Sequence, residues 1–250
     1  MITWTESASH NDQVLIKPFF IEHNNRKVPG VIYCPTDLPK NRPLVLIGHG
    51  GSQDKTHPNI KEIASLWVKK DQFYVAVIDG PIHGQRRDDN LSGVELQTAF
   101  RQMWISDNKI DSMVEDWIAV INGLIAEFKF IDENRIGWYG ISMGTAYGIP
   151  LIANEKKIIA AVLGMLGTDF INSQRISDDS PKVFCPVLFQ QKWDDQFFSR
   201  NGQLDLFEKI GSVEKYLKIY PGEHSPVVGQ QQLDIVEFLS KKLSAFVVRN

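Results

Sequence analysis

Several features that define other classes of protein are missing from this sequence. No stretch is long and apolar enough to span a bilayer. The first seven residues have neither the basic nor the apolar part of a secretory signal, so we expect no such signal. No run of lysines or arginines occurs, and the formal net charge is -3 at pH 7. This charge balance argues against nucleic acid and against an anionic membrane as partners.

Cysteines and metal-ligand patterns are also scarce. The two cysteines, Cys34 and Cys185, lie far apart in the sequence, each in a stretch expected to form a strand. Two buried thiols are therefore favoured over a disulfide, and they fit a reducing cytoplasm, which is the predicted location. The six histidines are scattered and no Cys/His pair has the spacing of a zinc site, so we expect no metal.

What is present predicts one α/β domain over residues 1–250. A chain of this length that is 43% hydrophobic can bury one substantial core. Residues 13–21 and 26–34 predict an antiparallel hairpin at the edge of a sheet. From residue 44 onward, short apolar runs alternate with helical stretches, which predicts a mostly parallel sheet with helices on both faces. The apolar runs are residues 44–47, 73–78, 136–139, 158–163, 187–190 and 216–220.

Residues 87–108 interrupt this alternation. Their apolar residues stand among polar ones without strand periodicity, so we predict a small helical insertion. A partial cap over the site and a surface helix that only closes the core are equally supported. Arg86 and Arg87 are expected to pair with Asp88, Asp89 or solvent rather than with an acidic substrate.

The most informative stretch lies between residues 136 and 146. A short apolar run meets Gly140-Ile141-Ser142-Met143-Gly144 and passes into a segment that can be helical. This is the strand-to-helix context of a nucleophile elbow, in which glycines let crowded chains approach and the serine hydroxyl stands at the top of the sheet. We therefore predict that Ser142 is the nucleophile. Gly148 and Pro150 should weaken or kink the following helix within about two turns.

The loop Gly48-His49-Gly50-Gly51-Ser52 follows the first buried run. A dinucleotide-binding fingerprint would need a glycine at Gln53, so these small residues suit an oxyanion hole better. We predict that the N–H groups of Gly51 and Met143 bind the developing oxyanion, with Gly50 as a weaker candidate. A plain glycine turn is the alternative.

A serine hydroxyl needs a base, and the base needs an orienting carboxylate. Later strand ends offer Asp194 or Asp195 and then His224, which gives the chain order Ser, Asp, His. In this architecture such groups gather beyond the carboxyl ends of the strands. His83 precedes the serine, and a structural or pocket-lining role is expected for it. The predicted substrate pocket consists of His83, Trp104, Met165 and Phe170.

The sequence resembles the α/β-hydrolase superfamily, and within it the small dienelactone-hydrolase-like and prolyl-oligopeptidase-like serine esterases. The resemblance begins at about Val31 and implies the α/β-hydrolase fold. In the family the catalytic aspartate usually stands three residues after a strand-ending glycine. Lys192 occupies that place here, and counting from it selects Asp195 over Asp194. The residues that carry the resemblance are Gly48-His49-Gly50-Gly51, Asp79-Gly80-Pro81-Ile82-His83-Gly84-Gln85-Arg86, Gly140-Ile141-Ser142-Met143-Gly144, Asp194-Asp195 and Gly222-Glu223-His224.

Together these residues predict hydrolysis of a small-molecule carboxylic ester through an acyl-enzyme at Ser142. No cofactor is expected, because the chain supplies the nucleophile, the base and the oxyanion donors. True dienelactone hydrolases carry a cysteine nucleophile, so their substrate is not implied. A small peptidase, an acyltransferase on the same three residues and a non-catalytic ligand-binding module are the alternatives.

Overall fold

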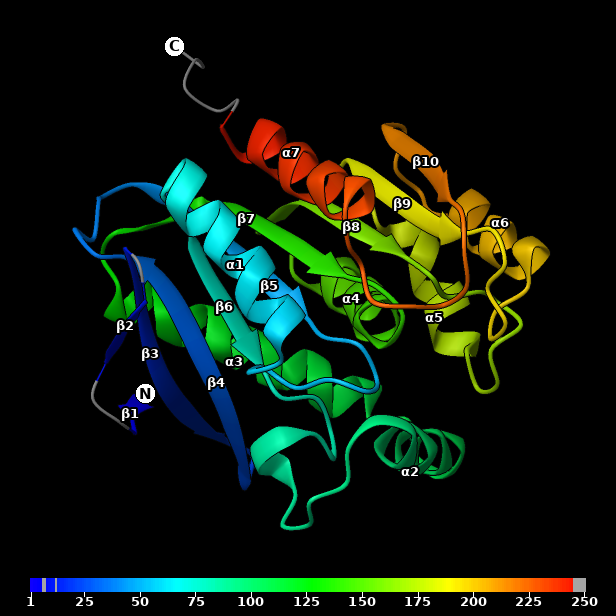
Figure 1. Ribbon diagram of the computed structural model, residues 1–250, viewed down its shortest axis with the longest axis horizontal. Coiled ribbons are helices and arrows are strands. Elements are labelled where there is room, and N and C mark those ends of the chain that lie inside the picture. Colours follow the sequence, from blue (N-terminus) through cyan, green and yellow to red (C-terminus); the bar gives the residue numbers. More distant parts are fainter. Residues whose placement is uncertain (6–7, 12, 245–250) are drawn as a thin grey trace.

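A computed structural model describes residues 1–5, 8–11 and 13–244 of the chain (Figure 1). Its centre is a ten-stranded sheet with the order β1-β3-β4-β6-β5-β7-β8-β9-β10, and β2 pairs with β3. The strands are β1 (Ile2–Trp4), β2 (Ser9–Asn11), β3 (Val14–His23), β4 (Arg26–Pro35), β5 (Arg42–Gly48), β6 (Tyr74–Ile78), β7 (Ile131–Gly140), β8 (Ile158–Gly164), β9 (Val187–Lys192) and β10 (Lys215–Tyr220). The helices are α1 (Pro58–Asp71), α2 (Gly93–Ser106), α3 (Ile110–Glu127), α4 (Met143–Asn154), α5 (Gln174–Asp179), α6 (Arg200–Lys209) and α7 (Gln230–Ser244), with short 3₁₀ turns η1 (Gly84–Arg86) and η2 (Ser180–Lys182).

The strand directions confirm the predicted fold class. All neighbouring strands from β6 to β10 in the sheet order are parallel, whereas β3 and β4 form an antiparallel hairpin and β4 runs antiparallel to β6. The hairpin turns at Asn24 and Asn25, whose φ angles of 47° and 59° match the right-handed twist of the flanking strands. The short strands β1 and β2 were not predicted; they extend the antiparallel edge by pairing with β3.

Helices cover both faces of the sheet, which explains why the central strands are continuous apolar runs. On β5, Leu44 and Leu46 pack into one hydrophobic cluster with α3 and α4. Val45 and Ile47 point to the other face and pack with α1 and α7. Figure 1 shows α1 and α7 on one face of the sheet, with α3 and α4 on the opposite face. Because helices cover both faces, the loops that follow the carboxyl ends of the parallel strands gather at one end of the sheet, where a site can form.

Helix α4 does not end at Gly148 or Pro150; it continues to Asn154. All its residues from Met143 to Ala153 are buried, so tertiary packing outweighs the low helix propensity of these two residues. Gly148 is needed for contact with β7, because a Cβ there would lie 2.2 Å from Trp138 Nε1.

Both cysteines are free thiols, as expected. Cys34 is buried in β4, but Cys185 precedes β9 and is only partly buried, so its predicted strand position was wrong. Among the helices of the described residues, none is both long and apolar enough to cross a membrane.

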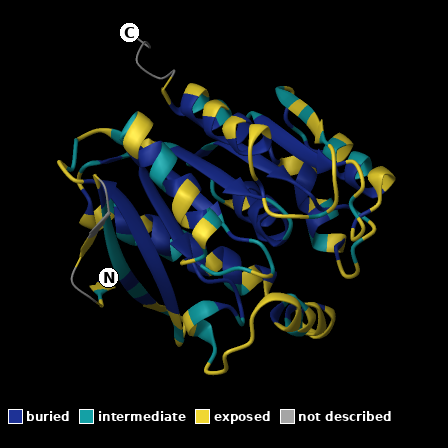
Figure 2. Ribbon diagram, viewed as in Figure 1, coloured by how far each residue is buried: buried dark blue, intermediate teal, exposed yellow. Residues whose placement is uncertain are grey.

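The predicted insertion at residues 87–108 contains α2, which buries only Leu96, Phe100 and Trp104. Figure 2 shows that most of the central strands are buried, whereas α2 presents much exposed surface. Val94, for example, is 77% exposed.

Candidate active site

Ser142 stands between the end of β7 and the first residue of α4. Its φ of 57° places a non-glycine residue in the left-handed region, as a sharp strand-to-helix turn requires. The turn is tight enough that a Cβ on Gly144 would lie 2.2 Å from the Gly48 carbonyl oxygen. The buried Thr145 hydroxyl holds the turn against β8, because it lies 2.9 Å from the Gly140 oxygen and 2.7 Å from the Gly164 oxygen.

The structure brings Ser142, His224 and Asp195 together from three strand ends. The Nε2 atom of His224 lies 3.0 Å from Ser142 Oγ, and its Nδ1 atom lies 2.8 Å from Asp195 Oδ2. The loop after β10 that carries His224 is fixed against the loop after β9 by the bond from the His224 amide to Gln196 Oε1, which measures 2.8 Å. A hydroxyl, an imidazole and a carboxylate in this order can move a proton from the hydroxyl to the ring.

The two adjacent aspartates have different environments. The Asp195 side chain is fully buried, and its Oδ1 atom accepts bonds from the amides of Phe197 and Phe198 at 2.9 and 3.0 Å. Asp195 Oδ2 lies 3.4 Å from Nε2 of the buried Gln203, in addition to His224. The Asp194 side chain is 56% exposed and lies 3.7 Å from the Arg200 guanidinium. Asp195, and not Asp194, therefore faces the imidazole.

Gly51 and Met143, the predicted oxyanion donors, line the same cavity as Ser142. Met143 is the first residue of α4, so its N–H has no partner within the helix. The Gly50 carbonyl oxygen accepts a hydrogen bond from the Gln53 amide at 3.0 Å. The Gly51 N–H belongs to the same peptide bond as this carbonyl, and in a trans peptide the C=O and the N–H point in opposite directions. The Gly51 N–H therefore points away from the Gln53 amide. The Gly50 N–H donates to the Gln53 side chain at 3.0 Å, which leaves Gly51 as the better donor of the two glycines.

His49 fixes the same loop from behind. The Gly80 amide donates to His49 Nε2 at 2.8 Å, so the ring proton resides on Nδ1, which lies 2.9 Å from the Gly50 carbonyl oxygen. Burial, with a further contribution from His83, lowers the pKa of His49 from 6.5 to about 3. The ring is therefore neutral in the folded protein, and in this tautomer it joins the loops after β5 and β6.

His83 and Trp104 do not line the cavity, contrary to the prediction. His83 is fully buried, with Nδ1 2.7 Å from the Pro81 oxygen and Nε2 3.0 Å from the Gly51 oxygen, and burial lowers its pKa. Trp104 packs behind Phe100 and Phe170, and its Nε1 donates to the Ile171 oxygen at 2.7 Å. Both residues support the wall from the side that faces away from Ser142.

Ser142 opens into a cavity of about 500 Å³. Met165, Leu166 and Phe170 line it. Several aromatic residues of this wall were not predicted, among them Phe197 and Phe198, whose ring centroids lie 5.2 and 5.5 Å from that of His224. Their position directly after Asp195 and Gln196 was a signal that could have been used. Phe100 of α2 was also missed as a lining residue.

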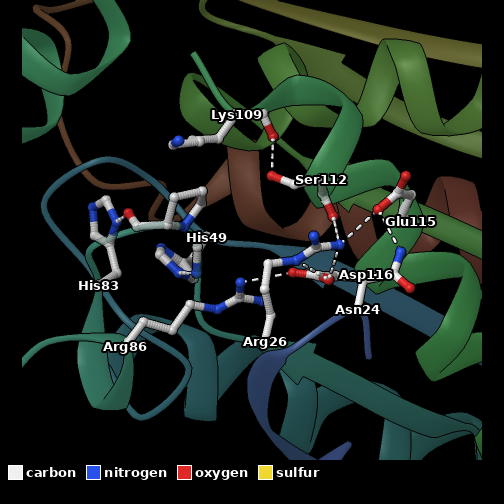
Figure 3. Close-up of polar contacts among 11 residues, drawn as sticks. Asn24, Arg26, His49, His83, Arg86, Lys109, Ser112, Glu115 and Asp116 are labelled. Atoms are coloured by element: carbon white, nitrogen blue, oxygen red, sulfur yellow. Dashed lines mark hydrogen bonds and ion pairs between the residues drawn. The ribbon is translucent and has the colours of Figure 1, made fainter. Parts of the chain in front are cut away.

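An ionic cluster anchors η1, which follows His83 (Figure 3). Arg86 does not pair with Asp88 or Asp89; its Nη1 atom lies 2.7 Å from Asp116 on α3. Asp116 is fully buried and also pairs with Arg26 of β4 at 2.9 Å, and Arg26 pairs in turn with Glu115 at 2.7 Å, so the cluster joins two guanidinium groups to two carboxylates. Removing one partner of a buried ion pair leaves an uncompensated charge in the interior, so loss of Arg86 would destabilise the fold around Asp116.

Arg87 pairs with Asp89, as expected. Within the described part of the chain, no three His, Cys, Asp or Glu side chains are grouped so that they could hold a metal ion.

Comparison with known proteins gives relatives only among solved structures. No protein-family model matches the sequence, and no curated protein does either. A cold-adapted esterase from an Arctic intertidal metagenomic library is 32% identical, with a TM-score of 0.86 over 96% of this chain and 99% of its own. An acetyl xylan esterase from a Paenibacillus species is 12% identical, with a TM-score of 0.74 over 97% of this chain and 88% of its own. A dienelactone hydrolase from Anabaena variabilis is 16% identical, with a TM-score of 0.67 over 93% of this chain and 98% of its own.

The last two likenesses concern the fold alone, whereas the first combines fold, sequence and nearly complete coverage of both chains. The sheet order, the serine at the turn between β7 and α4, and this relative lead to one assignment. The chain belongs to the α/β-hydrolase superfamily and is an enzyme of the carboxylesterase type.

Proposed function

We propose that this protein hydrolyses a carboxylic ester of a small molecule, with Ser142 as nucleophile, His224 as general base and Asp195 as the orienting acid. The observation that carries the proposal is the continuous chain of contacts from Ser142 Oγ to His224 at 3.0 Å and on to Asp195 at 2.8 Å, beside the cavity. The esterase relative supports the reaction class.

In the first step, Ser142 Oγ bonds to the ester carbonyl carbon while its proton passes to His224 Nε2. The amides of Gly51 and Met143 donate to the oxyanion that forms. The bond to the alcohol then breaks, and the alcohol oxygen takes the proton from His224. Asp195 keeps Nδ1–H of the ring in place and offsets the charge that the ring gains.

In the second step, His224 takes a proton from water, and the water oxygen bonds to the acyl carbon. The bond between the acyl carbon and Ser142 Oγ then breaks, and the proton returns to the serine. The chain supplies the nucleophile, the base, the orienting carboxylate and the oxyanion donors for both steps, so the proposed mechanism includes no cofactor and no metal.

The proposal extends to the organisation of the chain. We take residues 1–250 as one hydrolase domain and residues 87–108 as a partial cap. Support for the cap comes from α2, because Val94, Phe100 and Arg101 all line the cavity. The cytoplasm is the proposed location, supported by two free thiols. Nucleic acid and membranes are not among the proposed partners.

A fluorophosphonate probe tests the nucleophile, because it reacts with an activated serine. Intact mass should show one adduct on the wild type and none on Ser142→Ala. Ser52→Ala is the matched control, since Ser52 also lines the cavity, and it should still take one adduct. An adduct on Ser142→Ala would refute the assignment.

Ester hydrolysis by the same three proteins tests the reaction. Ser142→Ala should lose turnover with 4-nitrophenyl acetate, and Ser52→Ala should keep it. Rates with and without added alcohol separate an acyltransferase from a hydrolase, and aminoacyl amides test for peptidase activity. A folded wild type that takes no adduct would favour a ligand-binding module.

A further inference from the structure

One arginine of the cavity wall has no partner among the residues that the structure describes. Arg101 lies on α2 and is exposed, and in the described part of the chain its guanidinium forms no ion pair or hydrogen bond. Each of the other described arginines donates a hydrogen bond to another residue. These are Arg26, Arg42, Arg86, Arg87, Arg135, Arg175 and Arg200.

The position of Arg101 distinguishes it from an ordinary surface residue. Arg101 is the sole arginine among the described residues that line the cavity, and no lysine, aspartate or glutamate lines it. The N-terminus of α4 at Ser142 adds partial positive charge to the same space. The Asp195 carboxylate is not among the groups that line the cavity: it is fully buried and is directed to His224 and to two amides.

The spacing on α2 directs Arg101 to the cavity. Val94, Gln97, Thr98 and Arg101 all line it, and their spacing of three, four and seven residues places them on one face of the helix. Phe100, the neighbour of Arg101, reaches the oxyanion loop, since a Cβ on Gly51 would lie 3.4 Å from its ring. Thus the exposed side of α2 gives the cavity a polar, positively charged border, while Met165, Phe170 and Phe198 give it an apolar one.

We propose that Arg101 binds an anionic group, such as a carboxylate, on the ester substrate. The enzyme then prefers esters that carry a negative charge away from the scissile carbonyl over neutral esters of the same shape. A guanidinium suits this task because it donates two parallel hydrogen bonds to a carboxylate. The inference rests on the proposed function, since it names the substrate class of the same site.

Two pairs of esters test the proposal and locate the charge. The first pair is 4-acetoxybenzoate and its neutral methyl ester, with the charge on the alcohol side; the second is monoethyl adipate and diethyl adipate, with the charge on the acyl side. The wild type should have the higher kcat/KM for the charged member of at least one pair. Arg101→Gln should lower that value about tenfold and leave the neutral member unchanged, whereas Arg101→Lys should retain part of the preference.

Glu95→Gln is the matched control, because Glu95 is exposed on the same helix but does not line the cavity. It also removes one charge, and it should leave both preferences as in the wild type. An equal effect of Arg101→Gln on charged and neutral esters would overturn the proposal, and so would a wild type without any preference. A protein that takes the fluorophosphonate but hydrolyses none of the four esters would overturn the substrate class and leave the nucleophile assignment intact.

Discussion

Acid should destabilise this protein through His49, well above the pH at which carboxylates titrate. The folded state holds this ring neutral, with its pKa lowered to about 3, whereas the unfolded chain binds a proton near pH 6.5. Between these two values the unfolded state holds more protons, so stability falls as the pH falls. From pH 8 to pH 5 the loss from His49 alone amounts to about 2 kcal/mol by this linkage. The pKa of His83 is lowered as well and adds a loss of the same sign.

Urea unfolding at pH 8, 6.5 and 5 measures this loss as the change in the extrapolated free energy of unfolding. In His49→Gln the amide can donate to Gly50 and accept from Gly80, but it does not titrate. This variant should begin less stable at pH 8 and then lose about 2 kcal/mol less than the wild type on going to pH 5.

His57→Asn is the control, since it removes a partly exposed histidine at the start of α1 and leaves His49 in place. It should keep the wild-type slope. Equal slopes for the wild type and His49→Gln would refute the reasoning, because the buried ring would then not be the group that responds to acid.

Two further predictions concern positions near the site. Gln203→Leu removes the amide that lies 3.4 Å from Asp195 Oδ2, so kcat should fall about tenfold with KM unchanged, and the acid limb of the pH–rate profile should move to higher pH. The control Gln102→Leu, on the exposed side of α2, should change neither kcat nor the pH–rate profile. An unchanged profile for Gln203→Leu would refute the role of Gln203 as a partner of Asp195. Gly144→Ala should cost at least about 3 kcal/mol in thermal or urea unfolding, because its methyl group would lie 2.2 Å from the Gly48 oxygen. Gly51→Ala meets only the Phe100 ring at 3.4 Å and should fold normally; equal loss in both would contradict this packing argument.

The fold could be predicted because its signals are local. Each central strand is a continuous apolar run, as burial on both faces requires, and β3 and β4 flank an Asn-Asn turn. The short strands β1 and β2 gave no such signal, since three residues show no periodicity and their pairing depends on β3. Helix α4 extends past Gly148 and Pro150 because its burial among neighbouring elements outweighs the low helix propensity of these two residues.

Within the site, residues at strand ends were easier to place than residues on the walls. Ser142 and His224 follow strands whose carboxyl ends share one edge of the sheet, so topology brings them together. The choice between Asp194 and Asp195 depends on which carboxylate faces His224, a contact between residues 29 positions apart in the chain.

Trp104 was placed on the cavity wall for a related reason. Hydrophobicity marked Trp104 as buried but could not tell whether it faced the cavity or the layer behind it. Its neighbours Phe100 and Phe170 occupy the cavity side, and Trp104 packs against both.

These differences suggest where specificity can change without loss of the fold. The loops around Ser142 are fixed by buried contacts from several elements, including His49 and Thr145, so substitutions there disturb the reacting groups. Helix α2 buries only Leu96, Phe100 and Trp104, and its cavity-facing residues Val94, Gln97 and Arg101 carry little of the core. Because such exposed positions usually alter stability by less than about 0.5 kcal/mol, substitutions on this face of α2 can change which ester is accepted while the proposed chemistry at Ser142 stays intact.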